Sequence, residues 1–149
     1  MRLVADILTS KTKAMNENEI NKQIILSFYE VMLNERQTDR IDEIVSPEYC
    51  NAAGAGPEAI KQGALQLLKA FPDIHWQVEE ILSGDSRVMV KQCATGTHQG
   101  VFQGHAPSGK GFSTEGFALY KFSHGKIVSH QIITDRYSFL QQIGVLEKK

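Results

Sequence analysis

The chain has 149 residues, of which 16 are basic and 17 acidic, so its formal net charge is -1. This length suffices for one domain with a sizeable core. The near-neutral charge gives no support for nucleic acid or an anionic membrane as a partner. No run of about 20 apolar residues predicts a membrane span. A secretory signal is not indicated either, so the expected location is the cytoplasm.

The first half of the chain carries helical patterns. We expect residues 1–17 to form a loosely attached leader and residues 18–149 to form a single domain. Apolar residues at helical spacing predict an amphipathic helix over 18–36. A short helix is predicted over 38–46, where Thr38 is its N-cap and Pro47 its stop. A third helix is predicted from Pro57, at its first turn, to just before Pro72.

Beyond Pro72 the apolar pattern changes to period two. Residues 73–98 predict two strands joined by a turn at residues 83–86. A glycine-rich loop over 98–111 precedes a strand over 112–122. A turn then leads to a last strand, and residues 136–144 follow as a short helix or coil. Helices followed by antiparallel strands indicate an α+β fold with helices against one face of a curved sheet.

The candidate metal ligands are scattered along the chain. Cys50 and Cys93 lie far apart without CxxC spacing, which favours buried small side chains over a disulfide or a metal site. No pair of histidines has HxxxH or similar spacing. We therefore expect no metal site.

Three stretches of the sequence match a known family pattern. They are AFPDIHWQVEEIL, GTHQGVFQGHAPSGK and KFSHGKIVSHQIITD, followed by QQIG. Together they resemble the SnoaL-like polyketide cyclase (ester cyclase) family of the nuclear transport factor 2-like superfamily, over about residues 18–144. The resemblance implies a cone-shaped α+β barrel, in which a strongly bent antiparallel sheet and three N-terminal helices enclose an apolar cavity. It also implies a homodimer and no metal or organic cofactor.

The hairpin before Asp135 predicts which side chains share a face. Ser123, His124 and Gly125 fit a three-residue loop, although a two-residue loop would shift the pairing by one. On the first register, one face carries Ile127, Ser129, Gln131, Ile133 and Asp135 together with Lys121, Leu119, Phe117 and Glu115. If this face lines the cavity, its walls are Phe117, Leu119 and Ile133, and its polar contacts are Gln131 and Glu115. His130 then points to the opposite side.

Asp135 has two interpretations. A desolvated aspartate can be tuned to take a proton next to a carbonyl, and the resemblance implies that Asp135 is the general acid/base. Alternatively, its carboxylate caps the helix that follows. His98 matches the motif histidine of the family, as a second catalytic candidate or as a residue that stabilises the glycine bend.

Three further residues are candidate ligand contacts. Asn51 could hold a substrate carbonyl or enolate, or it could form a turn. Trp76 and Tyr29 are aromatic candidates for the cavity wall, and most aromatic residues of this kind belong to the core.

The function that we expect is binding of an apolar or polycyclic carbonyl compound in a central cavity. If the protein is an enzyme, the reaction is a cofactor-free cyclisation or isomerisation of the aldol type. One alternative is a non-catalytic ligand-binding module. Another is a hydrolase or dehydratase of the same superfamily, which would need a carboxylate pair such as Asp135 and Glu115.

Overall fold

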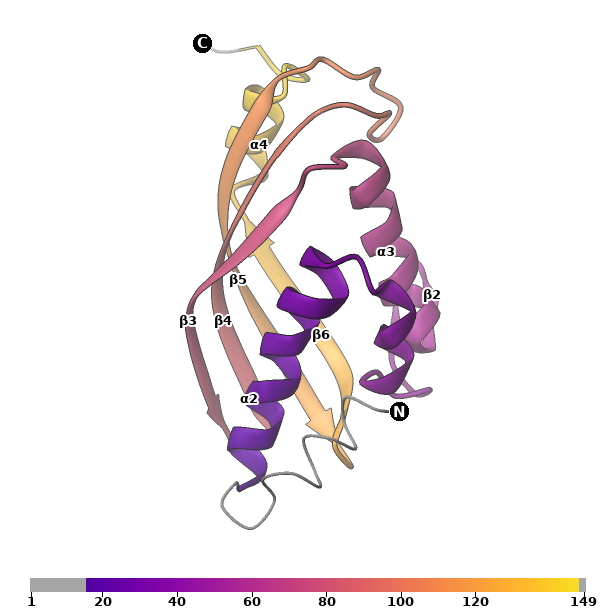
Figure 1. Ribbon diagram of the computed structural model, residues 1–149, viewed down its shortest axis with the longest axis vertical. Coiled ribbons are helices and arrows are strands. Elements are labelled where there is room, and N and C mark those ends of the chain that lie inside the picture. Colours follow the sequence, from indigo (N-terminus) through magenta and orange to yellow (C-terminus); the bar gives the residue numbers. More distant parts are fainter. Residues whose placement is uncertain (1–15, 148–149) are drawn as a thin grey trace.

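The computed structural model describes residues 16–147, which form a curved antiparallel sheet with helices on its concave side (Figure 1). The sheet has four strands in chain order, each joined to the next as an antiparallel neighbour. They are β3 (His75–Gly84), β4 (Arg87–Thr97), β5 (Gly111–Ser123) and β6 (Lys126–Thr134). This order needs no crossover, so the expectation of an α+β fold is confirmed.

The predicted first helix changes its geometry halfway along. It begins as α2 (Glu17–Ser27), where the Asn16 side chain accepts a hydrogen bond from the Glu19 amide as an N-cap. It continues as a wider π-helical segment, η1 (Phe28–Asn34). Residues 1–15 of the predicted leader lie outside the described residues. Asn16 and Glu17 already belong to the start of the helix.

The other short elements follow the predicted order. The second helix is a 3₁₀ helix, η2 (Thr38–Glu43), and the third is α3 (Gly56–Ala70), which carries a proline in its first turn. Between them, β1 (Cys50–Asn51) pairs with β2 (Gly54–Ala55). The last helix of the described residues is α4 (Arg136–Gln142).

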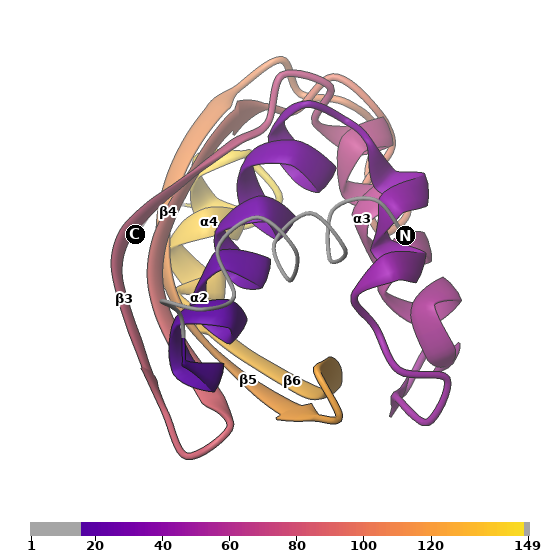
Figure 2. The same ribbon diagram turned by 60° about the horizontal axis from the view of Figure 1, so that its bottom comes forward.

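The helices and the sheet enclose one core. Figure 2 shows the sheet curving around α2, with α3 on the far side of α2 from β3. Within the described residues, β3 and β6 are the two edges of the sheet and do not pair with each other, so the predicted barrel is not closed. The segment 44–46 covers part of the β6 edge, where the Ile127 amide donates to the Ile44 carbonyl and the Ser46 amide donates to the Ile127 carbonyl.

The register of the last hairpin differs from the predicted one. The loop has two residues, His124 and Gly125, both with positive φ, and Ser123 pairs with Lys126. The pairing then shifts at Val128, so that Phe122 faces Ile127 but Lys121 faces Ser129. Ile127 is therefore fully buried on the inner face, and the prediction that it shares a face with Ser129 and Gln131 was wrong.

The cysteines and the length of the helices test two further expectations. Cys50 and Cys93 are both free thiols, and neither is buried as predicted, because Cys50 is exposed and Cys93 is partly exposed. No helix among residues 16–147 is long and apolar enough to cross a membrane.

Candidate functional site

A mainly apolar cavity of about 230 Å³ lies between η1, α3 and the inner face of the sheet. We call it the first chamber. Its lining combines aromatic side chains with a few polar ones, as is usual for small-molecule sites. The lining residues are Phe28, Tyr29, Leu33, Tyr49, Asn51, Ala59, Ile60, Gly63, Ala64, Leu67, Trp76, Gln92, Tyr120, His130 and Ile132.

The π-helical segment η1 places Phe28, Tyr29 and Leu33 in the wall of the first chamber. Its last residue, Asn34, ties the segment to β3, because its side-chain amide donates to the Trp76 carbonyl at 2.7 Å and its oxygen accepts from the Trp76 amide at 2.9 Å. These two bonds position Trp76 against the chamber. Such wide turns occur often at functional sites.

A pair of buried tyrosines is the main polar feature of the wall. The Tyr29 and Tyr120 hydroxyl oxygens lie 2.7 Å apart, and either hydroxyl can donate to the other. Burial raises the pKa of Tyr29 to about 12 and raises that of Tyr120 well above its usual value. Both hydroxyls therefore keep their protons at neutral pH, and the one that accepts within the pair has a proton left for a ligand.

His130 stacks on Tyr120, with ring centroids 4.7 Å apart and the rings nearly parallel at 8°. Burial lowers the pKa of His130 to about 4, because the imidazolium form loses its hydration. The imidazole is therefore neutral at pH 7. Its Nε2 atom is buried and has no hydrogen-bond partner. A buried nitrogen without a hydrogen-bond partner costs free energy.

Asn51 forms the predicted turn and also lines the first chamber, and its contact with a substrate stays a prediction. Its oxygen accepts from the Ala53 amide at 2.8 Å, which forms the turn between β1 and β2. Its side-chain nitrogen donates to the Tyr49 hydroxyl at 3.2 Å, and both residues line the first chamber. Asn51, Trp76 and Tyr29 are thus the predicted contacts that the structure brings together.

The five predicted contacts from the last two strands lie elsewhere. Glu115, Phe117, Leu119, Gln131 and Ile133 are absent from the lining of the first chamber and lie on the outer face of the sheet. Phe117 is 53% exposed and Ile133 is 77% exposed. Their assignment to the cavity was therefore wrong. The inner face is the opposite one, which carries Tyr120, His130 and Ile132.

In the structure, Asp135 is the N-cap residue of α4. Its carboxylate accepts from the Ser138 amide at 3.0 Å at the start of α4, and the side chain is exposed. It does not line the first chamber. Its catalytic role stays a prediction that rests on the family motif.

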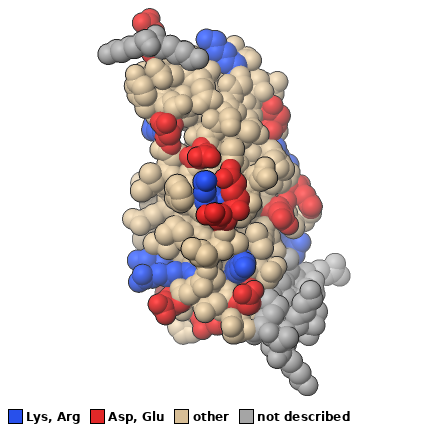
Figure 3. All heavy atoms as spheres, turned by 90° about the vertical axis from the view of Figure 1, so that its left-hand side faces the viewer, with Lys and Arg blue, Asp and Glu red and all other residues tan. Residues whose placement is uncertain are grey.

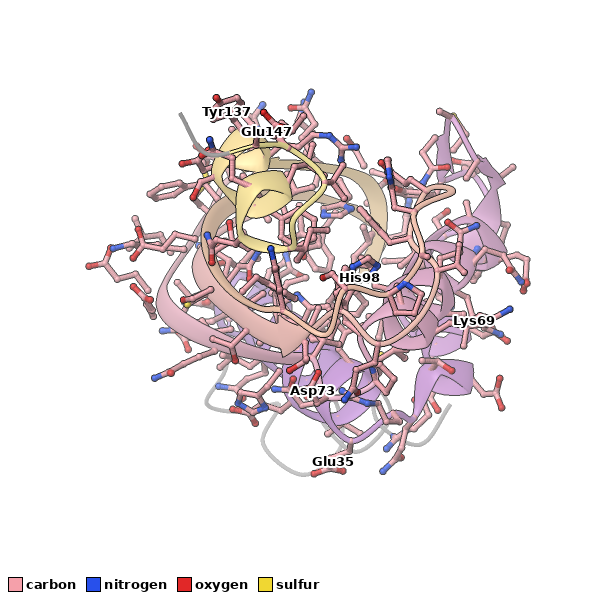
Figure 4. All side chains as sticks on the ribbon, turned by 90° about the horizontal axis from the view of Figure 1, so that it is seen from above. Glu35, Lys69, Asp73, His98, Tyr137 and Glu147 are labelled. Carbon is pink, nitrogen blue, oxygen red and sulfur yellow. The ribbon has the colours of Figure 1, made fainter. Side chains whose placement is uncertain are left out.

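His98 has a contact that stabilises the glycine-rich loop. Its Nδ1 accepts from the Ser108 amide at 3.2 Å, and the ring is fully buried beside Phe71. Figure 4 shows His98 inside the molecule near the loop, while Lys69 and Asp73 lie farther out. His98 does not line the first chamber, and its catalytic role also stays a prediction.

Sequence reasoning missed Tyr120 and His130 as site residues. A signal was present, because the face chosen for the cavity carries Glu115 and Lys121, and charged side chains seldom point into an apolar cavity. The opposite face carries Gly116, Ala118 and Tyr120, which suit an enclosed space.

The helices and the curved sheet enclose a mainly apolar cavity, an arrangement that is common in proteins that bind small molecules. Residues 23–143 match the family model described as SnoaL-like polyketide cyclase. The chain therefore belongs to the SnoaL-like polyketide cyclase family, as the sequence motifs indicated. A comparison with curated proteins gave no significant match.

Several solved structures share the fold. TsrD from Streptomyces laurentii is 19% identical with a TM-score of 0.78, over 85% of this chain and 96% of TsrD. AclR from Streptomyces galilaeus, described as a candidate hydroxylase, is 26% identical with a TM-score of 0.74, over 87% of this chain and 83% of AclR. IdmH from Streptomyces antibioticus, a candidate polyketide cyclase, is 23% identical with a TM-score of 0.70, over 83% of this chain and 98% of IdmH.

Proposed function

We propose that the protein binds an apolar or polycyclic carbonyl compound in the first chamber and catalyses a cofactor-free proton transfer on it, of the kind used in cyclisation and isomerisation. The observation that carries the proposal is the buried Tyr29–Tyr120 hydroxyl pair in a mainly apolar wall. A carbonyl oxygen at this pair meets a hydroxyl donor in a site of low polarity, where such a bond is strongest.

The same groups suit enolate formation. Negative charge develops on the carbonyl oxygen when a proton leaves the neighbouring carbon, and the tyrosine donor stabilises that charge. His130 can accept the proton because it is neutral at pH 7. Its low basicity in the empty chamber increases when an enolate forms nearby, since an adjacent anion favours the imidazolium.

Asp135 is the competing candidate for the acid/base. The family motif supports it, whereas the cavity geometry supports His130. The rate of proton exchange at a carbon next to a carbonyl tests which of Asp135 and His130 is the acid/base. Naphthyl methyl ketone is incubated with the protein in heavy water, and deuterium entry into its methyl group is followed by nuclear magnetic resonance.

We expect exchange faster than in buffer alone, and a return to the buffer rate in the His130→Phe variant, which keeps the ring stack but lacks the nitrogens. The Tyr120→Phe variant should slow exchange about tenfold, because it removes one of the paired hydroxyls. Exchange that is unchanged in His130→Phe but abolished in Asp135→Asn would move the acid/base role to Asp135.

A non-catalytic binding module is the second candidate. It is favoured because none of the described residues that line the first chamber is a carboxylate. Saturable binding of naphthyl methyl ketone without any gain in exchange would support this candidate and contradict the enzyme. A hydrolase would need a carboxylate pair in the chamber, and the position of Asp135 and Glu115 outside its lining gives that alternative no support.

We also propose that the protein is a homodimer through the outer face of the sheet. This face carries four exposed large apolar side chains, namely Leu82, Met89, Phe117 and Ile133. The same face also carries an ion pair between Lys91 and Glu79, and Phe117 lies opposite Lys91 on the neighbouring strand. Figure 3 shows this side, where acidic side chains gather around a basic one among mainly uncharged atoms. A second copy would remove the apolar side chains from water.

Light scattering during size-exclusion chromatography tests the dimer. The wild-type protein should elute at twice the chain mass, and the Ile133→Asp variant at the mass of one chain. Val101→Asp is the matched control, because Val101 is a similarly exposed apolar residue on the loop before β5. A wild-type protein at the mass of one chain contradicts the proposal.

A further inference from the structure

A second cavity of about 220 Å³ adjoins the first chamber at the other end of the sheet. We call it the second chamber. The two chambers share Leu67, Trp76, Gln92 and Ile132 in their linings, so they meet at these residues. Pockets for drug-sized ligands hold about 300–1,000 Å³. Neither chamber reaches that range alone, and together they do, which fits an elongated ligand that occupies both.

Four phenylalanines dominate one part of the second chamber. Phe71 contacts Phe102, Phe112 and Phe139, with ring centroids 5.1 to 5.6 Å apart. Phe139 also packs edge-on against Phe112 at 4.9 Å. All four line the chamber. Their edges and faces offer the tilted geometries that an additional aromatic ring prefers.

Two polar side chains in the second chamber have atoms without partners. The Gln92 side-chain oxygen and the Thr114 hydroxyl oxygen are buried, and neither has a hydrogen-bond partner. Gln92 is only 2% exposed and lines both chambers. Unpaired buried polar atoms cost free energy, which a ligand group could recover.

Gly116 makes room for the Gln92 amide. It pairs with Gln92 across the sheet, and a Cβ atom on it would lie 3.0 Å from the Gln92 side-chain nitrogen. The same Cβ would lie 2.7 Å from the Thr134 methyl carbon. Gly116 therefore lets both side chains lie across the inner face of the sheet.

Arg136 places a positive charge at the second chamber. Its guanidinium donates a hydrogen bond to the Gln103 side-chain oxygen, which comes from the glycine-rich loop. Among the described residues, no carboxylate lies within 4.0 Å of it in an ion pair. The neighbouring Asp135 carboxylate accepts from the Ser138 amide instead. A guanidinium without an acidic partner suits a carboxylate or another planar anion.

We propose that the second chamber binds an aromatic ring bearing an anionic group, so that the ligand is an elongated aromatic acid. The inference rests on the proposed function, because the carbonyl end of the same molecule occupies the first chamber. The ring packs among the four phenylalanines, Gln92 and Thr114 contact a polar atom in the middle of the ligand, and Arg136 pairs with the anion.

Isothermal titration calorimetry with two matched probes tests the inference. The probes are biphenylcarboxylate and the neutral biphenylcarboxamide, which have nearly the same shape. The wild-type protein should bind the acid about tenfold or more tightly than the amide, as expected for a bond to a charged group. Arg136→Gln should remove this preference, and Arg136→Lys should keep most of it. Arg87→Gln is the control, since Arg87 is an exposed arginine at the far end of β4 and outside both chambers.

The outcomes separate the two proposals. Binding of both probes with equal affinity overturns the anion site and leaves the proposed function standing. An acid preference that survives in Arg136→Gln, or that is lost equally in Arg87→Gln, also overturns the role of Arg136. Failure of the wild-type protein to bind either biphenyl probe or naphthyl methyl ketone overturns both proposals.

Discussion

His130 should make the stability of the protein depend on pH in a defined window. Its pKa is 6.5 in an unfolded chain and about 4 in the folded protein, where burial disfavours the charged ring. Between these values the unfolded chain binds a proton that the folded protein does not. The free energy of unfolding is therefore fully retained above about pH 6.5 and decreases as the pH falls towards 4. A difference of roughly 2.5 pKa units corresponds to about 3 kcal/mol.

Urea unfolding of the wild-type protein and the His130→Phe variant measures this contribution, with the fluorescence of the only tryptophan, Trp76, as the signal. Phenylalanine keeps the stack on Tyr120 and cannot titrate. Between pH 7 and pH 4 the wild-type protein should lose about 3 kcal/mol more than the variant. His75→Phe, at an exposed histidine, is the control and should parallel the wild type. If His130→Phe also parallels the wild type, His130 is not buried as a neutral imidazole.

Three other substitutions test the fold around the chambers. Asp135→Ala should lower the free energy of unfolding by about 1 kcal/mol, whereas Asp135→Asn, which can still cap α4, should change it by only a few tenths; equal losses in urea unfolding would contradict the capping role. Gly116→Ala should cost about 1–3 kcal/mol in the same assay, because its Cβ would overlap Thr134 and Gln92, and Gly84→Ala, with no atom within 4 Å, is its control. Asn34→Ala should cost about 1–3 kcal/mol by leaving backbone groups of Trp76 without partners, and an unchanged midpoint would show that these bonds add nothing.

The order and type of the elements could be predicted because the residues that each element buries recur along the chain at the spacing of a helix or a strand. On β4, Val88, Val90 and Ala94 are buried and alternate with more exposed residues, so the period of two is visible in the chain. Pro57 and Pro72 mark the limits of α3 in the same local way. These features, with the glycine-rich motifs, were sufficient to indicate the fold class and the family.

The period of two in the apolar residues could not by itself identify the inner face of the last hairpin, and the charges of Glu115 and Lys121 on the outer face were the main local indication. Both faces of β5 carry large apolar side chains, with Phe117 and Leu119 on one face and Tyr120 and Phe122 on the other. The register also depends on the shift at Val128, next to the point where Ile127 pairs with the segment 44–46. This contact joins residues far apart in the chain.

The sequence by itself thus determined an α+β domain of the SnoaL-like family, with Tyr29, Asn51 and Trp76 at its cavity. Only the tertiary structure decided that His130 and Tyr120, rather than Gln131 and Phe117, line the first chamber. The physical reason is that periodicity states which residues of a strand share a face. Which of the two faces is covered depends on the helices and distant segments that pack against it.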